Sequence, residues 1–279
     1  MREHDPGRTQ VVIGSALPVD DLSGRVALVC GGTGRIGRAI TRQLAAGGAS
    51  VAVHCHRRRE RAESLLTGLK KDQPGHLQSQ RHIVVAGDLA SVTAAHAVVR
   101  EVRDKMGAPP AIVVNAAHPE TGPAATDQIS DSHLNAHIDG FRIHVNVCRA
   151  TIAGMRDSGA GRLILISGAL AVRPFPGLGV YGAVKAAANA FSRTLALEEG
   201  SYGTTVNIVS LGRVEYEDGT QAFDPDPRYE ALDKITRMRM ALTKMATPAD
   251  VARTVSFLVS PASSAITGQV LYLAGGEAM

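Results

Sequence analysis

The chain has 279 residues, a length that suits one large α/β domain or two small ones. Hydrophobic residues make up 44% of it and can fill a sizeable core, while 20% charged residues are ordinary for a globular protein. The formal net charge of +4 does not indicate a nucleic-acid binder, because no basic stripe with interleaved aromatic residues accompanies it.

Three cysteines, Cys30, Cys55 and Cys148, show neither paired nor metal-like spacing, so we expect no disulfide framework and no metal site. The first residues lack an apolar signal core, and no stretch approaches the length of a membrane span. We therefore expect a cytoplasmic protein in a reducing compartment, without membrane or nucleic-acid partners.

Residues 1–22 are polar and irregular, and we expect a flexible N-terminal arm. From 23 to 279 short Val/Ile-rich runs alternate with longer Ala-rich patterns such as Arg38–Ala46 and Ala183–Glu199. The expected strands are Val26–Cys30, Val51–His54, Ile83–Ala86, Ile112–Asn115, Leu163–Ser167, Val206–Val209 and Gln269–Leu273. This alternation predicts a single doubly wound, Rossmann-type α/β domain, whose parallel sheet of about seven strands has helices on both faces.

A glycine-rich turn follows the first expected strand. It reads Gly31-Gly32-Thr33-Gly34-Arg35-Ile36-Gly37 and leads into a helical pattern. Glycines let the backbone approach a pyrophosphate closely, and the helix N-terminus offers free N–H groups and the positive end of a dipole. Because the turn lies between a strand and a helix, it predicts a dinucleotide site and not merely a glycine-rich turn.

The second expected strand runs into the sequence His54-Cys55-His56-Arg57-Arg58. In this fold the end of that strand faces the adenine ribose, where a carboxylate suits NAD and an arginine suits the 2′-phosphate of NADP. No acidic residue precedes Glu60 here, and guanidinium groups bind phosphate through forked, charge-assisted hydrogen bonds. We therefore predict NADP(H), with a solvated basic helix start as the alternative.

Tyr181 and Lys185 are four residues apart in an Ala-rich helical pattern, which places them on one face of a helix. A lysine ammonium beside a phenol lowers the pKa of the phenol, so that it can exchange a proton with a substrate oxygen near neutral pH. Such a pair is common on protein surfaces, and its significance depends on the other motifs.

Together these motifs resemble those of the short-chain dehydrogenase/reductase family, from about Leu22 to the C-terminus. The further matching motifs are Asp88-Leu89, Asn115-Ala116-Ala117, Leu211-Gly212-Arg213-Val214, Thr247-Pro248-Ala249-Asp250 and Ile266-Thr267-Gly268-Gln269. The resemblance implies an NADPH-dependent oxidoreductase, a ketoreductase that transfers hydride to a C=O or C=N group of a small molecule. It also implies a homotetramer or dimer, paired through the helices around Asp131–Met155 and Tyr181–Glu199.

The resemblance further implies roles for single residues. Tyr181 would be the proton donor, and Lys185 would hold the nicotinamide ribose and lower the pKa of Tyr181. Asp88 would contact the adenine, and Asn115 would lie along the adenosine side. The expected cofactor contacts are Gly31, Thr33, Gly34, Arg35, Ile36, Gly37, His56, Arg57, Arg58, Asp88, Leu89, Asn115, Ala116, Ala117, Tyr181, Lys185, Gly212 and Val214.

Two details resemble the pteridine-reductase branch of the family. Arg35 stands where most members have the middle glycine of the turn, and the stretch from His54 to Arg57 resembles that branch's 2′-phosphate site. Arg35 would then lie over the pyrophosphate and reach toward the substrate, unless it is a solvent-facing residue at the helix start. The turn also fits the Gly-x-x-Gly-x-x-Gly spacing of extended members, but the short chain and C-terminal motifs argue against that branch.

The substrate half departs from the family. Gly168 stands at the place of the usual catalytic Ser (an Asp in the pteridine-reductase branch), thirteen positions before the Tyr. Ser167 is adjacent, but neighbouring side chains on a strand point oppositely, so only a bulge would turn it inward. The family's Asn on the central helix falls on Gly140 or His137, and Tyr216 replaces the Thr that holds the carboxamide.

Three interpretations of these departures remain open. The substrate carries its own hydroxyl, another residue (Ser167, His118 or His137) stands in, or the protein no longer transfers hydride. The last leaves a cofactor-binding, elimination or cyclisation role on the same scaffold, although the retained Tyr–Lys pair favours proton chemistry. The segment Arg213–Ala246 interrupts the alternation of strand-like and helix-like runs, and we expect it either to cover the substrate or to form a surface loop.

Overall fold

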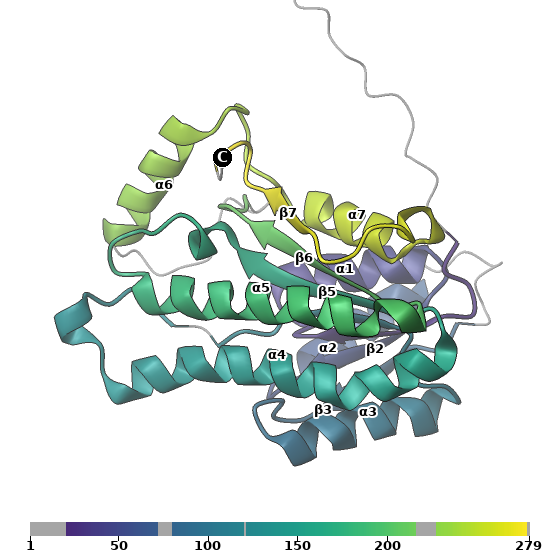
Figure 1. Ribbon diagram of the computed structural model, residues 1–279. Helices are drawn as coiled ribbons and strands as arrows, with labels where there is room; N and C mark the ends of the chain where they lie inside the picture. The colour runs from purple at the N-terminus through teal and green to yellow at the C-terminus, as the bar shows by residue number, and fades with distance from the viewer. Residues whose placement is uncertain (1–20, 72–79, 120, 216–226, 278–279) are drawn as a thin grey trace, which may run out of the picture.

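Seven parallel strands form one sheet in the computed structural model, which describes residues 21–71, 80–119, 121–215 and 227–277 (Figure 1). The strands are β1 Val26–Cys30, β2 Ser50–Cys55, β3 Ile83–Ala86, β4 Ile112–Asn115, β5 Arg162–Gly168, β6 Thr205–Leu211 and β7 Val270–Leu273. Their order is β3-β2-β1-β4-β5-β6-β7. The order reverses between β1 and β4, and ligands of doubly wound sheets bind at this switch point, beyond the carboxyl ends of the strands.

Helices cover both faces of the sheet (Figure 1). They are α1 Arg35–Ala46, α2 Arg59–Lys71, α3 Val92–Met106, α4 Asp131–Ser158, α5 Gly179–Glu199, α6 Pro227–Arg239 and α7 Pro248–Val259. Residues of α1, α2 and α7 share one buried cluster, and residues of α3, α4 and α5 share a second. The predicted Rossmann-type fold, with one domain and seven parallel strands, is confirmed.

Alternation along the strands divides the core into these two layers. In β1, Ala27 and Val29 join the layer under α1, whereas Val26 and Leu28 join the layer under α4. Successive side chains of a strand point to opposite faces, so a strand covered on both sides must be apolar at every position. Full burial of each Val or Leu contributes about 1.5–3 kcal/mol, and this drives the sheet between its two helical layers.

The element boundaries differ from those expected in instructive ways. Helix α1 begins at Arg35, directly after Gly34, and α5 begins at Gly179, so that Tyr181 lies in its first turn. The start of α1 lies outside the expected pattern Arg38–Ala46 because Gly34 and Gly37 interrupt the apolar periodicity, whereas Tyr181 was expected at the start of its helix. Leu22, assigned to the expected arm, is fully buried and donates its backbone N–H to the Gly47 carbonyl oxygen at 2.6 Å.

The segment Arg213–Ala246 contains helix α6, and an isolated bridge from Val214 to Ala246 joins its two ends. Position 216, where we expected a replacement for the carboxamide-holding Thr, lies outside the described residues. Within the described ranges, none of the helices has both the length and the apolar character needed to cross a membrane.

Candidate active site

The glycine-rich turn is compact because glycines meet backbone on two sides. Gly31 has φ +71°, and a Cβ there would lie 2.9 Å from the Ala116 carbonyl oxygen after β4. A Cβ on Gly37 would collide with the carbonyl oxygen of Gly31. A side chain at either position would push α1 away from the sheet, so these glycines keep the N-terminus of α1 at the switch point.

His54, on the neighbouring strand β2, holds this turn in place through hydrogen bonds of its ring. Its Nδ1 accepts the Gly31 backbone N–H at 3.3 Å, and its Nε2 donates to the Gly87 carbonyl oxygen at 2.9 Å. Burial lowers the pKa of His54 to about 4, so the ring is neutral, as these two bonds require. His54 therefore supports the turn from inside and is not part of an exposed phosphate-binding stretch.

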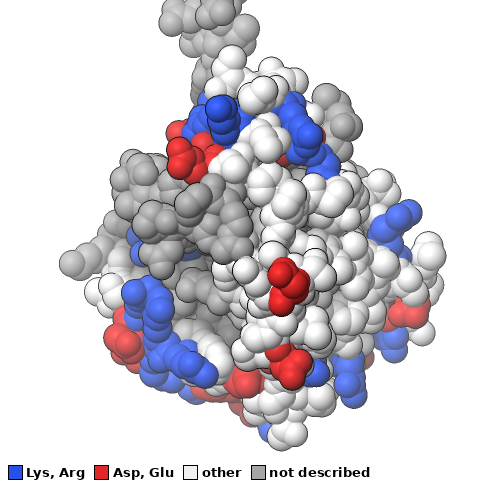
Figure 2. All heavy atoms as spheres, turned by 90° about the vertical axis from the view of Figure 1, so that its left-hand side faces the viewer, with Lys and Arg blue, Asp and Glu red and all other residues white. Residues whose placement is uncertain are grey.

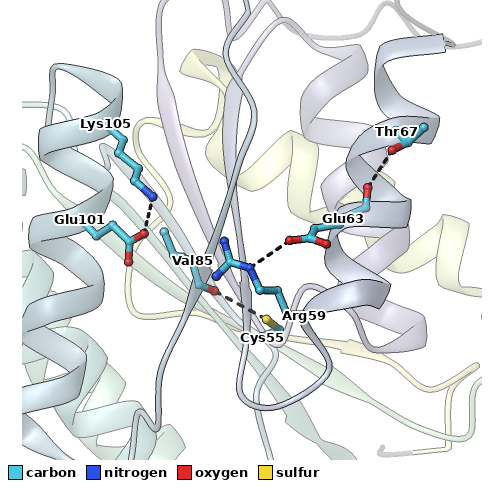
Figure 3. Close-up of polar contacts among 7 residues, drawn as sticks. All are labelled: Cys55, Arg59, Glu63, Thr67, Val85, Glu101 and Lys105. Carbon is cyan, nitrogen blue, oxygen red and sulfur yellow. Dashed lines mark hydrogen bonds and ion pairs between the residues drawn. The ribbon is translucent and has the colours of Figure 1, made fainter.

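The residues expected at the 2′-phosphate, His56, Arg57 and Arg58, are exposed directly after β2. Arg59, which begins α2, instead pairs with Glu63 one turn along, with 2.9 Å between Nε and Oε1 (Figure 3). In the same view Cys55 is turned inward, with its Sγ 3.8 Å from the Val85 carbonyl oxygen. Arg59 is thus engaged by its own helix, although its side chain is exposed like those of Arg57 and Arg58.

On the adenine side of the switch point, Asp88 is exposed, and its Oδ1 accepts the backbone N–H of Ala90 at 3.0 Å. Leu89 is buried beneath it. One carboxylate oxygen of Asp88 therefore shapes its own turn after β3, and the side chain stands at the edge where an adenine is expected.

Asn115 ends β4 and is buried in a chain of four hydrogen bonds. Its Oδ1 accepts the Ala117 N–H at 3.1 Å and its Nδ2 donates to His144 Nδ1 at 3.2 Å. His144 Nε2 then donates to Ser192 Oγ at 2.8 Å, and Ser192 donates to the Ala188 carbonyl oxygen at 2.8 Å. Burial lowers the pKa of His144 to about 3, which keeps the neutral tautomer that this chain needs. Asn115 therefore holds the backbone after β4.

Tyr181 and Lys185 meet as the sequence predicts. Lys185 Nζ lies 5.5 Å from the centre of the Tyr181 ring and donates to the Ile166 carbonyl oxygen at 3.3 Å. The lysine is buried, and burial lowers its pKa to about 8. The ammonium is thus confined beside the phenol at neutral pH.

The strand before Tyr181 is regular. Ser167 pairs with Ser210 and Gly168 with Leu211 in uninterrupted register, so β5 has no bulge to turn Ser167 inward. The Ser167 hydroxyl is buried and has no hydrogen-bond partner among the residues that the structure describes. A Cβ on Gly168 would lie 2.8 Å from Tyr181 Oη. Gly168 thus gives the phenol the space that a serine side chain would need.

His118 occupies the space of a side chain on the central helix. A Cβ on Gly140 would collide with the His118 imidazole. That ring lies edge-to-face on Tyr181, with centroids 5.3 Å apart. Its Nε2 is 3.4 Å from His137 Nδ1, and Thr121 Oγ1 is 2.7 Å from His137 Nε2.

Both of these imidazoles are neutral at ordinary pH. Burial lowers the pKa of His118 to about 2 and that of His137 to about 4, and the nearby Lys185 charge acts in the same direction. His133 adds a third ring, 4.8 Å from His137. Within the described ranges no group of three His, Cys, Asp or Glu residues could hold a metal ion. His118 and His137 therefore form a neutral polar wall beside Tyr181.

A cavity of about 310 Å³ lies beyond the carboxyl ends of the central strands. It is lined by Ile36, Ala116, His118, Pro119, Thr121, Ile166, Ser167, Gly168, Ala169, Leu170, Arg173, Leu178, Tyr181, Lys185, Leu211, Gly212, Arg213, Val214, Leu232, Thr236 and Glu277. It joins the start of α1, the Tyr–Lys pair and α6. Figure 2 shows the side of the molecule where α6 lies, and most Lys and Arg side chains lie near the edges of this view.

The far wall of this cavity contains residues that the sequence did not reveal. Arg173 pairs with Glu277, 2.6 Å from Nη1 to Oε1, and Thr236 donates to the same oxygen at 3.1 Å. Nearby, Arg213 Nε lies 3.2 Å from Asp233 Oδ1. These contacts join residues far apart in sequence, and no spacing motif marks them.

A family model described as Enoyl-(Acyl carrier protein) reductase matches residues 33–277. The acetoacetyl-CoA reductase of Allochromatium vinosum is 32% identical over 253 residues, which cover 90% of this chain and 98% of that protein. The chain belongs to the short-chain dehydrogenase/reductase family. As a member, it is an oxidoreductase, an NAD(P)-dependent reductase of this type.

Two further relatives carry cofactor information in their names. The chloroplastic NADPH-dependent aldehyde reductase 2 of Arabidopsis thaliana is 31% identical, over 91% of this chain and 94% of that protein. The crystal structure of a short chain dehydrogenase from Burkholderia cenocepacia in complex with NADP has a TM-score of 0.80 and 30% identity. That likeness covers 93% of this chain and 100% of the other.

Proposed function

We propose that this short-chain reductase uses NADPH to reduce a C=O or C=N group of a small molecule, with Tyr181 as the proton donor. The observation that carries the proposal is the position of Tyr181 on the cavity wall, beside the confined charge of Lys185. When bound, NADPH supplies the hydride. Tyr181 supplies the proton from its Oη, and Lys185 favours the phenolate that results.

The residues present fit this cofactor. Added Cβ atoms at Gly31 and Gly37 would fill the cradle at the start of α1, and that helix start suits a pyrophosphate. Arg57 and Arg58 are exposed where the 2′-phosphate is expected, and Asp88 is exposed at the adenine side. Two relatives named for NADPH or solved with NADP also support the choice. We propose the full set of cofactor contacts that the sequence analysis expects.

We also propose that His137 stands in for the family's Asn as a positioning residue. His137 is buried between Thr121 and His118, and His118 packs on the Tyr181 ring. Neutral rings in this row can orient the phenol without placing a second charge beside Lys185. Ser167 is a poorer substitute because its strand is regular. A His137→Gln change should then preserve more of kcat than His137→Ala, with similar NADPH binding.

Gly168 favours a second candidate, because no side-chain hydroxyl stands beside Tyr181 at that position. An elimination or cyclisation would use the same Tyr–Lys pair for proton transfer without consuming NADPH. The two candidates differ in whether a substrate drives NADPH oxidation. Loss of the hydrogen bond that a serine hydroxyl would donate to the substrate typically lowers the rate about 10²- to 10³-fold. Its absence would therefore slow a reductase without abolishing its activity.

The test of the cofactor is a fluorescence titration with NADPH and NADH. The Arg57→Ala and Arg58→Ala variants should weaken NADPH binding about tenfold or more and leave NADH binding unchanged. Arg59→Ala is the matched control, since Arg59 is engaged by Glu63. Equal binding of the two nucleotides by wild type would contradict the NADPH assignment.

We further propose a homo-oligomer, a dimer or tetramer, paired through α4 and α5. Leu197 of α5 is 86% exposed in the single chain, as a side chain buried between subunits would be. Light scattering on the purified protein should give a mass of two or four chains. The Leu197→Glu change should lower that mass, and a monomeric wild type would contradict the proposal.

A further inference from the structure

The carboxylate of Glu277 is fixed on the wall of the substrate cavity. Oε1 accepts from Thr236 Oγ1 at 3.1 Å and pairs with Arg173 Nη1 at 2.6 Å. The main-chain oxygen of Glu277 accepts from the same Arg173 nitrogen at 2.6 Å. Glu277 is buried, so these contacts hold one carboxylate oxygen and the backbone in a single orientation.

The second oxygen of this carboxylate faces a different environment. Oε2 lies 3.2 Å from the place of a Cβ on Gly212, and both Gly212 and Glu277 line the cavity. Within the described ranges no protein group donates a hydrogen bond to Oε2. An ionised carboxylate only accepts hydrogen bonds, and the Arg173 guanidinium offsets its charge. Oε2 is therefore an acceptor that suits an uncharged O–H or N–H donor.

The surroundings of this acceptor make it selective. Leu170, Leu178 and Leu232 line the same cavity and pack together in one apolar cluster, so they offer no competing polar partner. A ligand that brings an apolar group to this wall would strip water from Oε2 and leave it unpaired, which costs more than the bond itself contributes. Sites built to bind a hydroxyl reject analogues that lack it more strongly than apolar pockets reject an extra methylene.

We propose that Glu277 is a specificity-determining residue, whose Oε2 accepts a hydrogen bond from a hydroxyl that the substrate carries away from the reacting carbonyl. The substrate class is thus a hydroxylated carbonyl compound. The identity of the reacting carbonyl rests on the proposed function; the hydroxyl preference rests on Glu277 alone.

The test uses the ortho, meta and para isomers of hydroxyacetophenone and the matching methoxyacetophenones. Their kcat/KM with NADPH and their binding by calorimetry are measured for wild type, Glu277→Gln and Glu198→Gln. Glu198 is an exposed residue of α5 and serves as the matched control. In Glu277→Gln the oxygen can keep Thr236 and Arg173, while the amide nitrogen places a donor where Oε2 was.

Wild type should prefer at least one hydroxy isomer over its methoxy partner by roughly tenfold to a hundredfold. Glu277→Gln should remove or reverse that preference, and Glu198→Gln should keep it. An unchanged ratio in Glu277→Gln overturns the proposal, as does a wild type that shows no hydroxy preference in either assay. If Glu277→Gln does not fold, Glu277→Asp, which withdraws the carboxylate, should lower the ratio instead.

The two assays separate this inference from the proposed function. A calorimetric preference that depends on Glu277, without ketone-dependent NADPH oxidation, would keep the Glu277 inference and reject the reductase. Turnover with a ratio indifferent to Glu277 would do the opposite.

Discussion

His118 and Gly140 share one space: the imidazole that follows β4 lies where a side chain on the central helix would project. Gly140 is one of the two positions on which the family's Asn falls, and its lack of a side chain leaves room for the His118 ring. The His118 ring in that space packs against Tyr181. The Gly140→Asn change alone should therefore displace His118, lower kcat/KM and cost about 1–3 kcal/mol of stability.

A double-mutant cycle measures this coupling. His118→Gly combined with Gly140→Asn should recover part of the activity and stability lost in Gly140→Asn, because the space is vacated. Thermal unfolding and NADPH-oxidation rates of the four proteins give the coupling. Losses that simply add, within about 0.5 kcal/mol, would show that the two residues do not compete for the space.

Restoring the family's serine should not help this protein. The Gly168→Ser side chain would begin 2.8 Å from Tyr181 Oη, so we expect the phenol to be displaced and turnover to fall. Ser167→Ala, at the neighbouring residue, is the matched control. It removes a buried hydroxyl without a partner and should leave activity and stability nearly unchanged. Higher turnover in Gly168→Ser would refute the placement of Tyr181.

His54 should make the protein sensitive to mild acid. Its pKa in the folded state is about 4, below the value of 6.5 that is usual for histidine, so the unfolded chain binds more protons between these values. Its contribution to stability is present above pH 6.5 and is lost as the pH falls toward 4, by about 1.4 kcal/mol per pH unit. In urea unfolding, His54→Gln should reduce that slope by one proton. An unchanged slope would mean that His54 is charged when folded.

Ser192 should stabilise the protein through the buried hydrogen-bond chain that links it to His144 and Asn115. Its hydroxyl accepts from His144, and Ser192→Ala would leave a buried imidazole N–H without a partner, at a cost of about 1–3 kcal/mol. Ser132→Ala, at an exposed serine, is the control for urea denaturation. Equal stability of the two variants would argue against the hydrogen-bond chain through Asn115.

The fold, the compact glycine-rich turn and the contact between Tyr181 and Lys185 could be predicted from the sequence because local signals determine them. Continuous apolar runs specify strands covered on both faces, and Gly31 marks a turn that no residue with a Cβ could make. Tyr181 and Lys185 meet because one helical turn separates them. These relations need only a few consecutive residues.

The substrate half could not be predicted in the same way. Glu277 and Arg173 are 104 residues apart, and only the folded sheet brings them to one cavity. His54 was expected at the end of a buried strand, next to the 2′-phosphate stretch, but its bonds to the backbone of Gly31 and Gly87 depend on neighbouring segments and could not be predicted. The contact between His118 and Gly140 could not be predicted, because it depends on how the fold places the loop after β4 against α4.

Hydride transfer with Tyr181 as the proton donor is tested most directly by isotope. Wild type and Tyr181→Phe are given a hydroxyacetophenone and NADPH that carries deuterium at the transferable position, and the alcohol product is followed by mass spectrometry. Wild type should place a single deuterium in the product, and Tyr181→Phe should bind NADPH normally but form product at least about a hundredfold more slowly. Product without deuterium, or an unchanged rate in Tyr181→Phe, would contradict this mechanism.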